Sequence, residues 1–171
     1  QIKDIENLVN EFSSFARMPS PIFKKIQIEL TVKRAVDFYQ MSSKNEINLN
    51  FDKNKKIING DEEQLYRVFV NLIKNSEESI NEKKEKNEPF KGKINIEIYT
   101  NKDYINISLA DNGLGIADTS KIMTPYFTTK KNGTGLGLPI VSKIINEHGG
   151  ELIISKNNPG AKVLITLPKI N

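Results

Sequence analysis

Apolar residues recur at helical spacing in four parts of the chain. Between residues 61 and 80 they lie three or four positions apart, which places them on one face of a helix. This face consists of Leu65, Val68, Phe69, Leu72 and Ile73. The same spacing predicts further helices over 2–17, 31–43 and 136–148.

Other segments alternate apolar and polar residues, the pattern of half-buried strands. It predicts strands at 26–30, 47–51, 94–98, 105–109, 151–155 and 162–167, with a short one at 57–58. Asn101-Lys102-Asp103 separates two of these strands and favours an antiparallel hairpin. The order of elements predicts an α/β sandwich, with a mixed, mostly antiparallel sheet covered by helices on one face.

Helix ends and loops are indicated by polar and breaking residues. Asp61 and Gln64 resemble a capping box, and Thr31 is the expected cap of the helix that follows it. Residues 81–92 are polar and are expected to form a loop. Residues 111–135 are rich in Gly, Thr and Pro, and long loops of this kind in compact domains are usually functional or disordered.

The first helix carries an apolar stripe that needs a partner. Ile5, Leu8, Phe12 and Phe15 share one face, and Met18-Pro19-Ser20-Pro21 ends the helix. The chain begins with Gln1 rather than Met, so we expect a fragment whose partner helix is missing, with a lost membrane anchor left open.

Composition excludes several classes of site. The chain of 171 residues has no cysteine and one histidine, which excludes disulfides, thiolate metal sites and multi-histidine metal sites. No apolar run reaches the roughly 20 residues of a membrane span, and no signal peptide is visible. The net charge is +4, but the densest lysine cluster, residues 82–86, mixes signs and favours a solvated surface over nucleic-acid binding.

Asn71 and Asn75 lie one turn apart on the helix predicted over 61–80. Their carboxamide oxygens are hard ligands that suit a magnesium ion retaining phosphates and waters. The alternative is a pair of ordinary surface asparagines, which would be the better interpretation if this pair stood alone.

Asp111-Asn112-Gly113-Leu114-Gly115 follows a strand directly. A carboxylate at a strand end can accept a hydrogen bond from an adenine amino group, and the glycines let the backbone approach a flat base. A tight Asp-Asn-Gly turn without a ligand is the alternative.

Two further motifs lie in and after the long loop. Gly133-Thr134-Gly135-Leu136-Gly137-Leu138 opens a helix, where backbone N–H groups favour phosphate, although its spacing fits neither the Rossmann nor the Walker pattern. Pro125 to Lys130 offers aromatics that could tether a lid and, with Lys131, lysines that could reach phosphates; an ordinary tethered loop is the alternative.

Together and in this order, the four motifs resemble the histidine-kinase branch of the GHKL ATPase superfamily. They resemble its asparagine box, first glycine box, phenylalanine box (with Tyr126 where Phe is usual) and second glycine box. The resemblance covers about residues 22–168 and implies a Bergerat-type two-layer ATP-binding fold. Phe12 to Pro19 is similar to the end of the dimerisation helix in nitrogen-regulation sensors of the NtrY/NtrB type. This implies a partial dimerisation helix and linker over 1–21 and an ATP-binding catalytic domain over 22–171.

The resemblance also implies a role for each motif residue. Asn75 would ligate magnesium, with Asn71 and Lys130 beside it as catalytic residues, while Asp111 would bind the adenine amino group. The remaining nucleotide-binding residues would be Gly113, Gly115, Ile116, Thr128, Thr129, Lys131, Gly133, Thr134, Gly135, Leu136, Gly137 and Leu138. Glu78 departs from the basic residue common at its position, which leaves Lys130, Lys131 or Lys74 to meet the phosphate charge. His148 matches no phosphoacceptor motif, so we expect it to be structural.

The implied function is binding of Mg-ATP and transfer of the γ-phosphate to a histidine on an absent dimerisation domain, within a two-component system. The implied partners are that domain, a response regulator and, in the intact protein, a second copy of the chain; no nucleic acid is expected. The implied setting is the cytoplasmic part of a membrane-anchored bacterial sensor. Two alternatives remain: a hydrolytic ATPase, opposed by Asn71 where such enzymes carry a glutamate base, and a non-enzymatic nucleotide-binding module.

Overall fold

A five-stranded sheet forms one layer of the computed structural model, which describes residues 5–6, 9–10, 12–13, 16–86, 89–116, 120–126 and 133–170. The strand order is β2-β4-β5-β7-β6, with only β2 and β4 parallel among the neighbouring pairs. The strands are β2 (Glu46–Phe51), β4 (Lys93–Thr100), β5 (Tyr104–Asp111), β6 (Glu151–Lys156) and β7 (Ala161–Pro168). The predicted mixed, mostly antiparallel sheet is confirmed.

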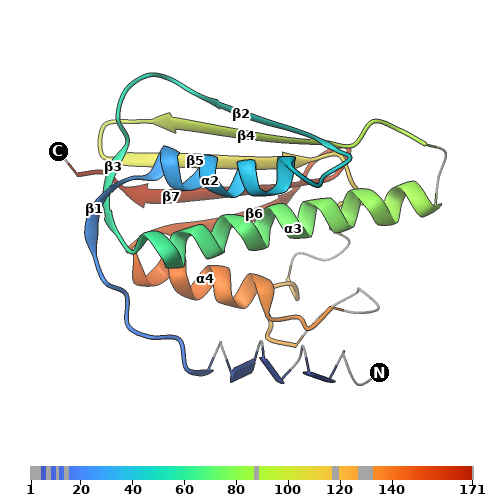
Figure 1. Cartoon of the computed structure of the whole chain (residues 1–171), viewed down its shortest axis with the longest axis horizontal. Coiled ribbons are helices and arrows are strands. Elements are labelled where there is room, and N and C mark those ends of the chain that lie inside the picture. Colours follow the sequence, from blue (N-terminus) through green and yellow to red (C-terminus); the bar gives the residue numbers. More distant parts are fainter. Residues whose placement is uncertain are drawn as a thin grey trace.

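Three helices form the second layer on one face of this sheet (Figure 1). They are α2 (Ile28–Gln40), α3 (Glu62–Lys86) and α4 (Gly137–Glu147), and α3 packs between the other two. The predicted apolar face of α3 is buried in the core, with Leu65, Val68, Phe69, Leu72 and Ile73 each at most 2% exposed. A separate antiparallel pair, β1 (Lys24–Gln27) and β3 (Ile57–Gly60), lies beside this sandwich.

The strand predicted at 26–30 is wrong in its second half. β1 ends at Gln27 and α2 begins at Ile28, so the alternation of Ile26, Ile28 and Leu30 was misleading. Helical spacing decides the outcome, because Ile28, Val32 and Ala35 are fully buried while Leu30 is 54% exposed. Thr31 is therefore inside the helix and is not its cap, and α2 ends at Gln40 rather than at residue 43.

The loop predicted over 81–92 is also wrong at its start, because α3 continues to Lys86. Ile80 is fully buried, and Lys83, Lys84 and Lys86 occupy the last turn, where positive charge favours the helix dipole. At the other end, the backbone N–H of Gln64 donates to Asp61 Oδ1 at 3.1 Å, so Asp61 caps α3 as predicted. The Gln64 side chain does not complete the box but donates to the Pro19 carbonyl at 2.9 Å.

Residues 5–6, 9–10, 12–13 and 16 are helical, in agreement with the helix predicted over 2–17, and Arg17 forms a turn. Ile5, Val9 and Phe12 are 62, 53 and 48% exposed. Leu8 and Phe15 lie outside the described residues, and the division of the chain at residue 21 stays a prediction. Within the described part of the chain, the helices are too short or too polar to traverse a bilayer.

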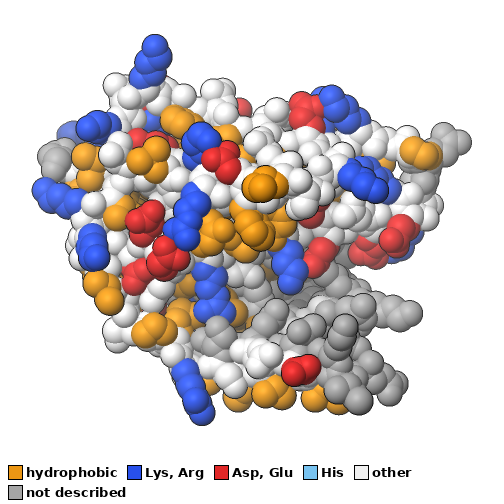
Figure 2. Space-filling model, viewed as in Figure 1, with side chains coloured by type: hydrophobic (Ala, Val, Ile, Leu, Met, Phe, Trp, Pro, Cys, Tyr) orange, Lys and Arg blue, Asp and Glu red, His pale blue; other side chains and the backbone are white. Residues whose placement is uncertain are grey.

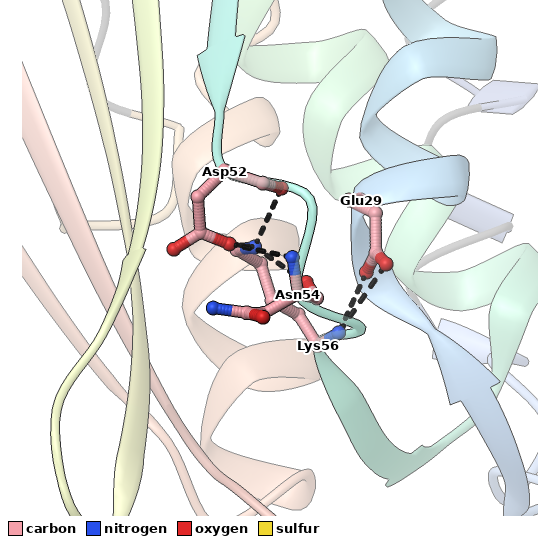
Figure 3. A network of polar contacts seen from close by, with 4 residues as sticks. All are labelled: Glu29, Asp52, Asn54 and Lys56. Carbon is pink, nitrogen blue, oxygen red and sulfur yellow. Dashed lines mark hydrogen bonds and ion pairs between the residues drawn. The ribbon is translucent and has the colours of Figure 1, made fainter.

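A buried lysine ties the β2–β3 loop to the start of α2 (Figure 3). Lys56 is fully buried, and its Nζ donates to Asp52 Oδ1 at 2.6 Å, Asn54 O at 2.7 Å and Asp52 O at 3.2 Å. Its backbone N–H donates to both carboxylate oxygens of Glu29, each at 3.2 Å. Three acceptors match the three ammonium protons, which offsets the cost of burying the charge.

His148 joins the end of α4 to the start of α3. Its Nε2 accepts from the backbone N–H of Asp61 at 2.9 Å, and its Nδ1 lies 2.7 Å from the Ile144 carbonyl. These partners assign the proton to Nδ1. The ring is 7% exposed, so the arrangement fits the structural role predicted for it.

The face of the molecule seen in Figure 2 carries interspersed basic and acidic side chains. Opposite charges neighbour each other on α2 and between α2 and α3: Lys33 pairs with Asp37 at 2.6 Å and Arg34 with Glu63 at 2.7 Å. The lysine-rich composition thus produces a mixed surface over these helices, as the sequence pattern indicates.

Candidate functional site

One side of α3 carries the residues around which the site is built. Asn71, Asn75, Ser76, Ser79 and Lys83 follow each other at intervals of one to four positions along the helix. Their side chains lie next to two other segments: the end of β5 with the loop after it, and the start of α4. The apolar face of the same helix is anchored in the core, which fixes the position of this polar side.

Asp111 ends β5 and is only 6% exposed. Its Oδ2 accepts from the Ser76 hydroxyl at 3.1 Å, and its Oδ1 accepts from the N–H of Gly113 at 2.9 Å and of Ala161 at 3.4 Å. Burial raises the pKa of this carboxyl above its ordinary value of 3.8, while these donors and the charge of Lys83 oppose the rise. The carboxylate is therefore held in one orientation in a largely dry environment.

The loop after Asp111 packs closely against α3. A Cβ at Gly113 would lie 2.4 Å from Ser79 Oγ and 2.8 Å from the Ser79 carbonyl carbon, so a larger residue does not fit. The N–H of Leu114 donates to Ser79 Oγ at 3.0 Å, and Lys83 Nζ donates to the Asn112 carbonyl at 2.7 Å. The first glycine motif is thus fixed by close contact with a helix.

The turn between β6 and β7 closes the other side of Asp111. Gly160 has a φ of +97°, and a Cβ there would lie 1.9 Å from the Asp111 carbonyl oxygen. Gly115 has a φ of +78°, and a Cβ on it would lie 2.7 Å from the Gly160 carbonyl oxygen. Both positions require glycine, because the backbone is left-handed and neighbouring backbone occupies the space.

The two asparagines face the start of α4. A Cβ at Gly137 would lie 3.6 Å from Asn71 Oδ1 and 3.9 Å from Asn75 Nδ2, so these amides border the first residue of that helix. Asn71 Nδ2 donates to the Arg67 carbonyl at 2.9 Å, which turns its oxygen toward Gly137. The structure therefore brings together the asparagine motif and the second glycine motif, 62 positions apart along the chain from residue 75 to residue 137.

A family model for "Histidine kinase-, DNA gyrase B-, and HSP90-like ATPase" matches residues 60–171, more than half of the chain. The chain belongs to this family. It is a histidine kinase ATP-binding catalytic domain of the kind found in two-component sensor kinases.

Among relatives of the kinase domain, a putative NtrY-like sensor histidine kinase of Rickettsia conorii is 34% identical over 94% of the chain. Sporulation kinase C of Bacillus subtilis is 34% identical over 98% of the chain. The chain spans 26% of the first relative and 39% of the second. The solved catalytic domain of the histidine kinase ThkA is 25% identical, with a TM-score of 0.75, 86% of this chain covered and 96% of that one.

The kinase domain also shows where the remaining predicted residues lie. Ile116, Thr134, Gly135 and Leu138 are half-buried, Leu136 is fully buried, and Gly133 is exposed. The N–H of Tyr126 donates to the Gly135 carbonyl at 3.1 Å, which links the phenylalanine motif to the second glycine motif. Thr128, Thr129, Lys130 and Lys131 lie outside the described residues, so their predicted roles stay predictions.

Several residues around the candidate site were not among those predicted from the sequence. Ser79 and Lys83 lie four and eight positions after Asn75, so they share its face of the helix, and this spacing could have pointed to them. Ser76 lies one position after Asn75 and has no such signal. Gly160 and Ala161 lie in a hairpin turn 49 and 50 positions after Asp111, and no local pattern links them to it. Glu78, noted as a departure, has its carboxylate 4.0 Å from Lys74 Nζ.

Proposed function

We propose that this domain binds Mg-ATP with its base at Asp111 and its phosphates toward the start of α4, and transfers the γ-phosphate to a histidine on a dimerisation domain. The observation that carries this proposal is the connection through α3. Ser76 contacts the Asp111 carboxylate, and the preceding residue, Asn75, borders Gly137. A base site and a phosphate site are thereby joined by adjacent residues of one helix.

The base end suits an amino group of a purine. The three donors to the Asp111 carboxylate leave acceptor capacity on its two oxygens, because an ionised carboxylate offers about four lone-pair sites. Gly113 and Gly115 let the loop after Asp111 pack against α3 and against the β6–β7 turn, which fixes its backbone beside the carboxylate. A hydrogen bond between the carboxylate and the amino group would be charge-assisted, which strengthens it in this buried setting.

The phosphate end suits a magnesium ion held mainly by the nucleotide. Asn71 and Asn75 supply neutral oxygen donors, and no group of three His, Cys, Asp or Glu side chains capable of holding a metal occurs in the described part of the chain. Magnesium is commonly bound through one or two protein oxygens together with phosphates and waters, so the residues fit. When bound, the ion would offset phosphate charge; Asn75 would hold it and Asn71 would support it.

The backbone at the start of α4 would orient the phosphates. Leu136 forms the N-cap of this helix without a side-chain cap bond, and the first turn has no acidic residue. Helix N-termini present N–H groups and a partial positive charge to anions. Gly137 keeps this end accessible beside the two asparagines.

The site favours transfer to an incoming nucleophile over hydrolysis. Asn71 lies one turn before Asn75, and its amide donates to the Arg67 carbonyl. A carboxamide cannot accept a proton at neutral pH, so Asn71 cannot activate water. The γ-phosphate would therefore await a histidine imidazole, and positioning would supply most of the catalysis.

The proposed partners are those expected of sensor histidine kinases, the proteins that the chain resembles. We propose that residues 1–21 are the C-terminal part of a dimerisation helix and the linker after it, that the phosphoacceptor histidine belongs to this dimerisation domain, and that two copies pair in a four-helix bundle. A response regulator would receive the phosphate, and the intact protein would be a bacterial sensor with this domain on the cytoplasmic side of the membrane.

The test combines the domain with a purified dimerisation domain that carries its histidine, and measures acid-labile phosphate and nucleotide affinity together. We expect transfer to the histidine but very slow ATP hydrolysis by the domain alone. Asp111→Ala should weaken ATP binding by about 10- to 100-fold, the loss of one charge-assisted hydrogen bond. Asn75→Ala should chiefly remove the dependence of binding on magnesium.

Two outcomes would contradict this proposal. Tight ATP binding without any transfer would indicate a non-enzymatic nucleotide-binding module. Fast steady-state hydrolysis by the isolated domain would indicate a hydrolytic ATPase with a base other than Asn71.

A further inference from the structure

Ser76 makes a contact that the motifs of the sequence do not include. It follows Asn75 directly on α3, is 4% exposed, and its hydroxyl donates to Asp111 Oδ2 at 3.1 Å. The two residues lie 35 positions apart along the chain, so this bond joins the helix layer to the end of β5. Among the described residues, the other donors to this carboxylate are the backbone N–H groups of Gly113 and Ala161, so Ser76 is the side-chain donor.

We propose that Ser76 is a positioning residue for base recognition: its hydroxyl fixes the Asp111 carboxylate as a pure acceptor and so selects bases that present an amino group. This inference rests on the proposed function, because it assumes that the base lies against Asp111. It deepens that function by naming a residue that would determine the preference among purines without touching the reacting phosphates.

The geometry divides the two carboxylate oxygens between backbone and side chain. Oδ1 accepts from two backbone N–H groups, those of Gly113 and Ala161, which no substitution at residue 76 removes. Oδ2 accepts from Ser76, so this hydroxyl sets the rotation of the carboxylate about its remaining torsion. An alanine at position 76 would remove one donor and leave the first oxygen bonded.

The same hydroxyl also bears on the protonation of Asp111. Burial raises the pKa of this carboxyl, and the bonds from Gly113, Ser76 and Ala161 together with the charge of Lys83 lower it. On the strands paired with β5, Lys93 precedes Ile94, which pairs with Asp111, and Lys162 pairs with Ala110. Both lysine side chains are exposed. Loss of the Ser76 hydroxyl would therefore move the pKa of Asp111 further upward.

Protonation changes which base the carboxyl can recognise. An ionised carboxylate only accepts hydrogen bonds, so it matches the 6-amino group of adenine and opposes the 6-oxo group of hypoxanthine. A protonated carboxyl has one O–H donor, which can bond to that oxo group. The ratio of affinities for adenosine and inosine diphosphates thus reports how far Asp111 is held as an acceptor.

The experiment measures binding of ADP and of inosine diphosphate by calorimetry, without magnesium, from about pH 5 to about pH 8. We compare the native chain with Ser76→Ala and Ser76→Thr, and with Ser142→Ala as a matched control. Ser142 lies on α4 and its hydroxyl accepts only weakly, from Asn146 Nδ2 at 3.4 Å. Circular dichroism and thermal unfolding verify that each variant is folded.

We expect Ser76→Ala to lose about 10-fold in ADP affinity, as for one hydrogen bond to a charged group. Its preference for ADP over inosine diphosphate should fall, and its loss of ADP binding on acidification should begin at higher pH. Ser76→Thr keeps the hydroxyl and should restore the preference even if its added methyl weakens binding of both nucleotides. Ser142→Ala should match the native chain in all three respects.

The inference is overturned if Ser76→Ala binds ADP within about twofold of the native chain with the same preference. It is also overturned if the affinities for both diphosphates fall equally and ADP binding is lost at the same acidic pH as in the native chain. That pattern indicates a purely structural role. Failure of Ser76→Thr to restore the preference would count against the hydroxyl. If the native chain binds neither diphosphate, the proposed function itself fails.

Discussion

The two ends of the candidate site differ in how completely the protein builds them. At the base end, Asp111 is buried and accepts hydrogen bonds from Ser76, Gly113 and Ala161. A Cβ at Gly160 would lie 1.9 Å from the Asp111 carbonyl oxygen, and one at Gly113 would lie 2.4 Å from Ser79 Oγ. At the phosphate end, Asn71 and Asn75 are half-buried, and Gly137 leaves ordinary van der Waals room beside them. The first end is packed like a core, and the second is less tightly packed.

This difference teaches how the binding free energy is divided. A group whose orientation is fixed before binding loses little conformational entropy when the ligand arrives. The base end has this property, so it can select the nucleotide. The phosphate end gains its remaining contacts from the ligand and from charge, which leaves it able to accommodate both the nucleotide and an incoming nucleophile.

The largest expected effect tests the packing of the base end. Gly160→Ala would place a Cβ 1.9 Å from the Asp111 carbonyl oxygen at a φ of +97°. We expect it to destabilise the fold by at least about 3 kcal/mol, measured by urea unfolding, because backbone must move. The control is Gly149→Ala, with a φ of +68° but its nearest neighbour, Pro168 Cγ, at 3.6 Å. This control should cost only about 1–2 kcal/mol, and equal losses would refute tight packing around Asp111.

A smaller effect concerns the charge at the base end. Because burial raises the pKa of Asp111 above 3.8, the folded state retains this proton more strongly than the unfolded state. Stability from this group is fully present below pH 3.8 and is lost as pH rises through the folded-state pKa. Asp111→Asn, which cannot ionise, should therefore be more stable than the native chain at neutral pH by about 1 kcal/mol.

That gain should disappear as the pH approaches the ordinary value of the carboxyl, and unfolding curves at a series of pH values measure it. A variant that is equally destabilised at every pH would show that the carboxylate is needed for packing and is not a cost of function.

The smallest effect is expected at the phosphate end. Gly137→Ala introduces a Cβ only to within 3.6 Å of Asn71 and 3.9 Å of Asn75. Its stability should stay within about 0.5 kcal/mol of the native chain, since alanine suits a helix. Mg-ATP affinity should fall by roughly threefold, because the methyl occupies room beside the phosphates. Destabilisation as large as that of Gly160→Ala would remove the contrast between the two ends.

The fold was predictable where one periodicity dominates. The core face of α3 and the hairpin of β4 and β5 were predicted correctly because their apolar residues fit a single pattern. The segment 26–30 is too short to distinguish the alternation of a strand from the spacing of a helix. The burial of Ile28, Val32 and Ala35 shows that residues from Ile28 onward belong to α2. Residues 81–86 lack a strong apolar signal, yet helix continues there with Ile80 anchored in the core.

The site was predictable to the extent that its residues belong to local motifs. Asp111, Asn75 and Gly137 were predicted in this way, and the structure brings the segments that carry them together around α3. The contacts of Gly160 and Ala161 with Asp111 depend on the pairing of β5 with β7, which no short pattern encodes. Ser76 was overlooked because serine in a helix has many ordinary explanations, and only its distance from Asp111 distinguishes it.

The helix α3 sets the distance between the parts of the candidate site. From Asn71 to Lys83 the helix rises by about 18 Å. Over this distance it carries the proposed magnesium ligands and contacts the Asp111 carboxylate and the loop that follows Asp111. One inserted residue would turn everything beyond it by about 100° and separate the two ends from a common ligand. Evolution can therefore exchange side chains along this stretch far more readily than it can change the number of residues.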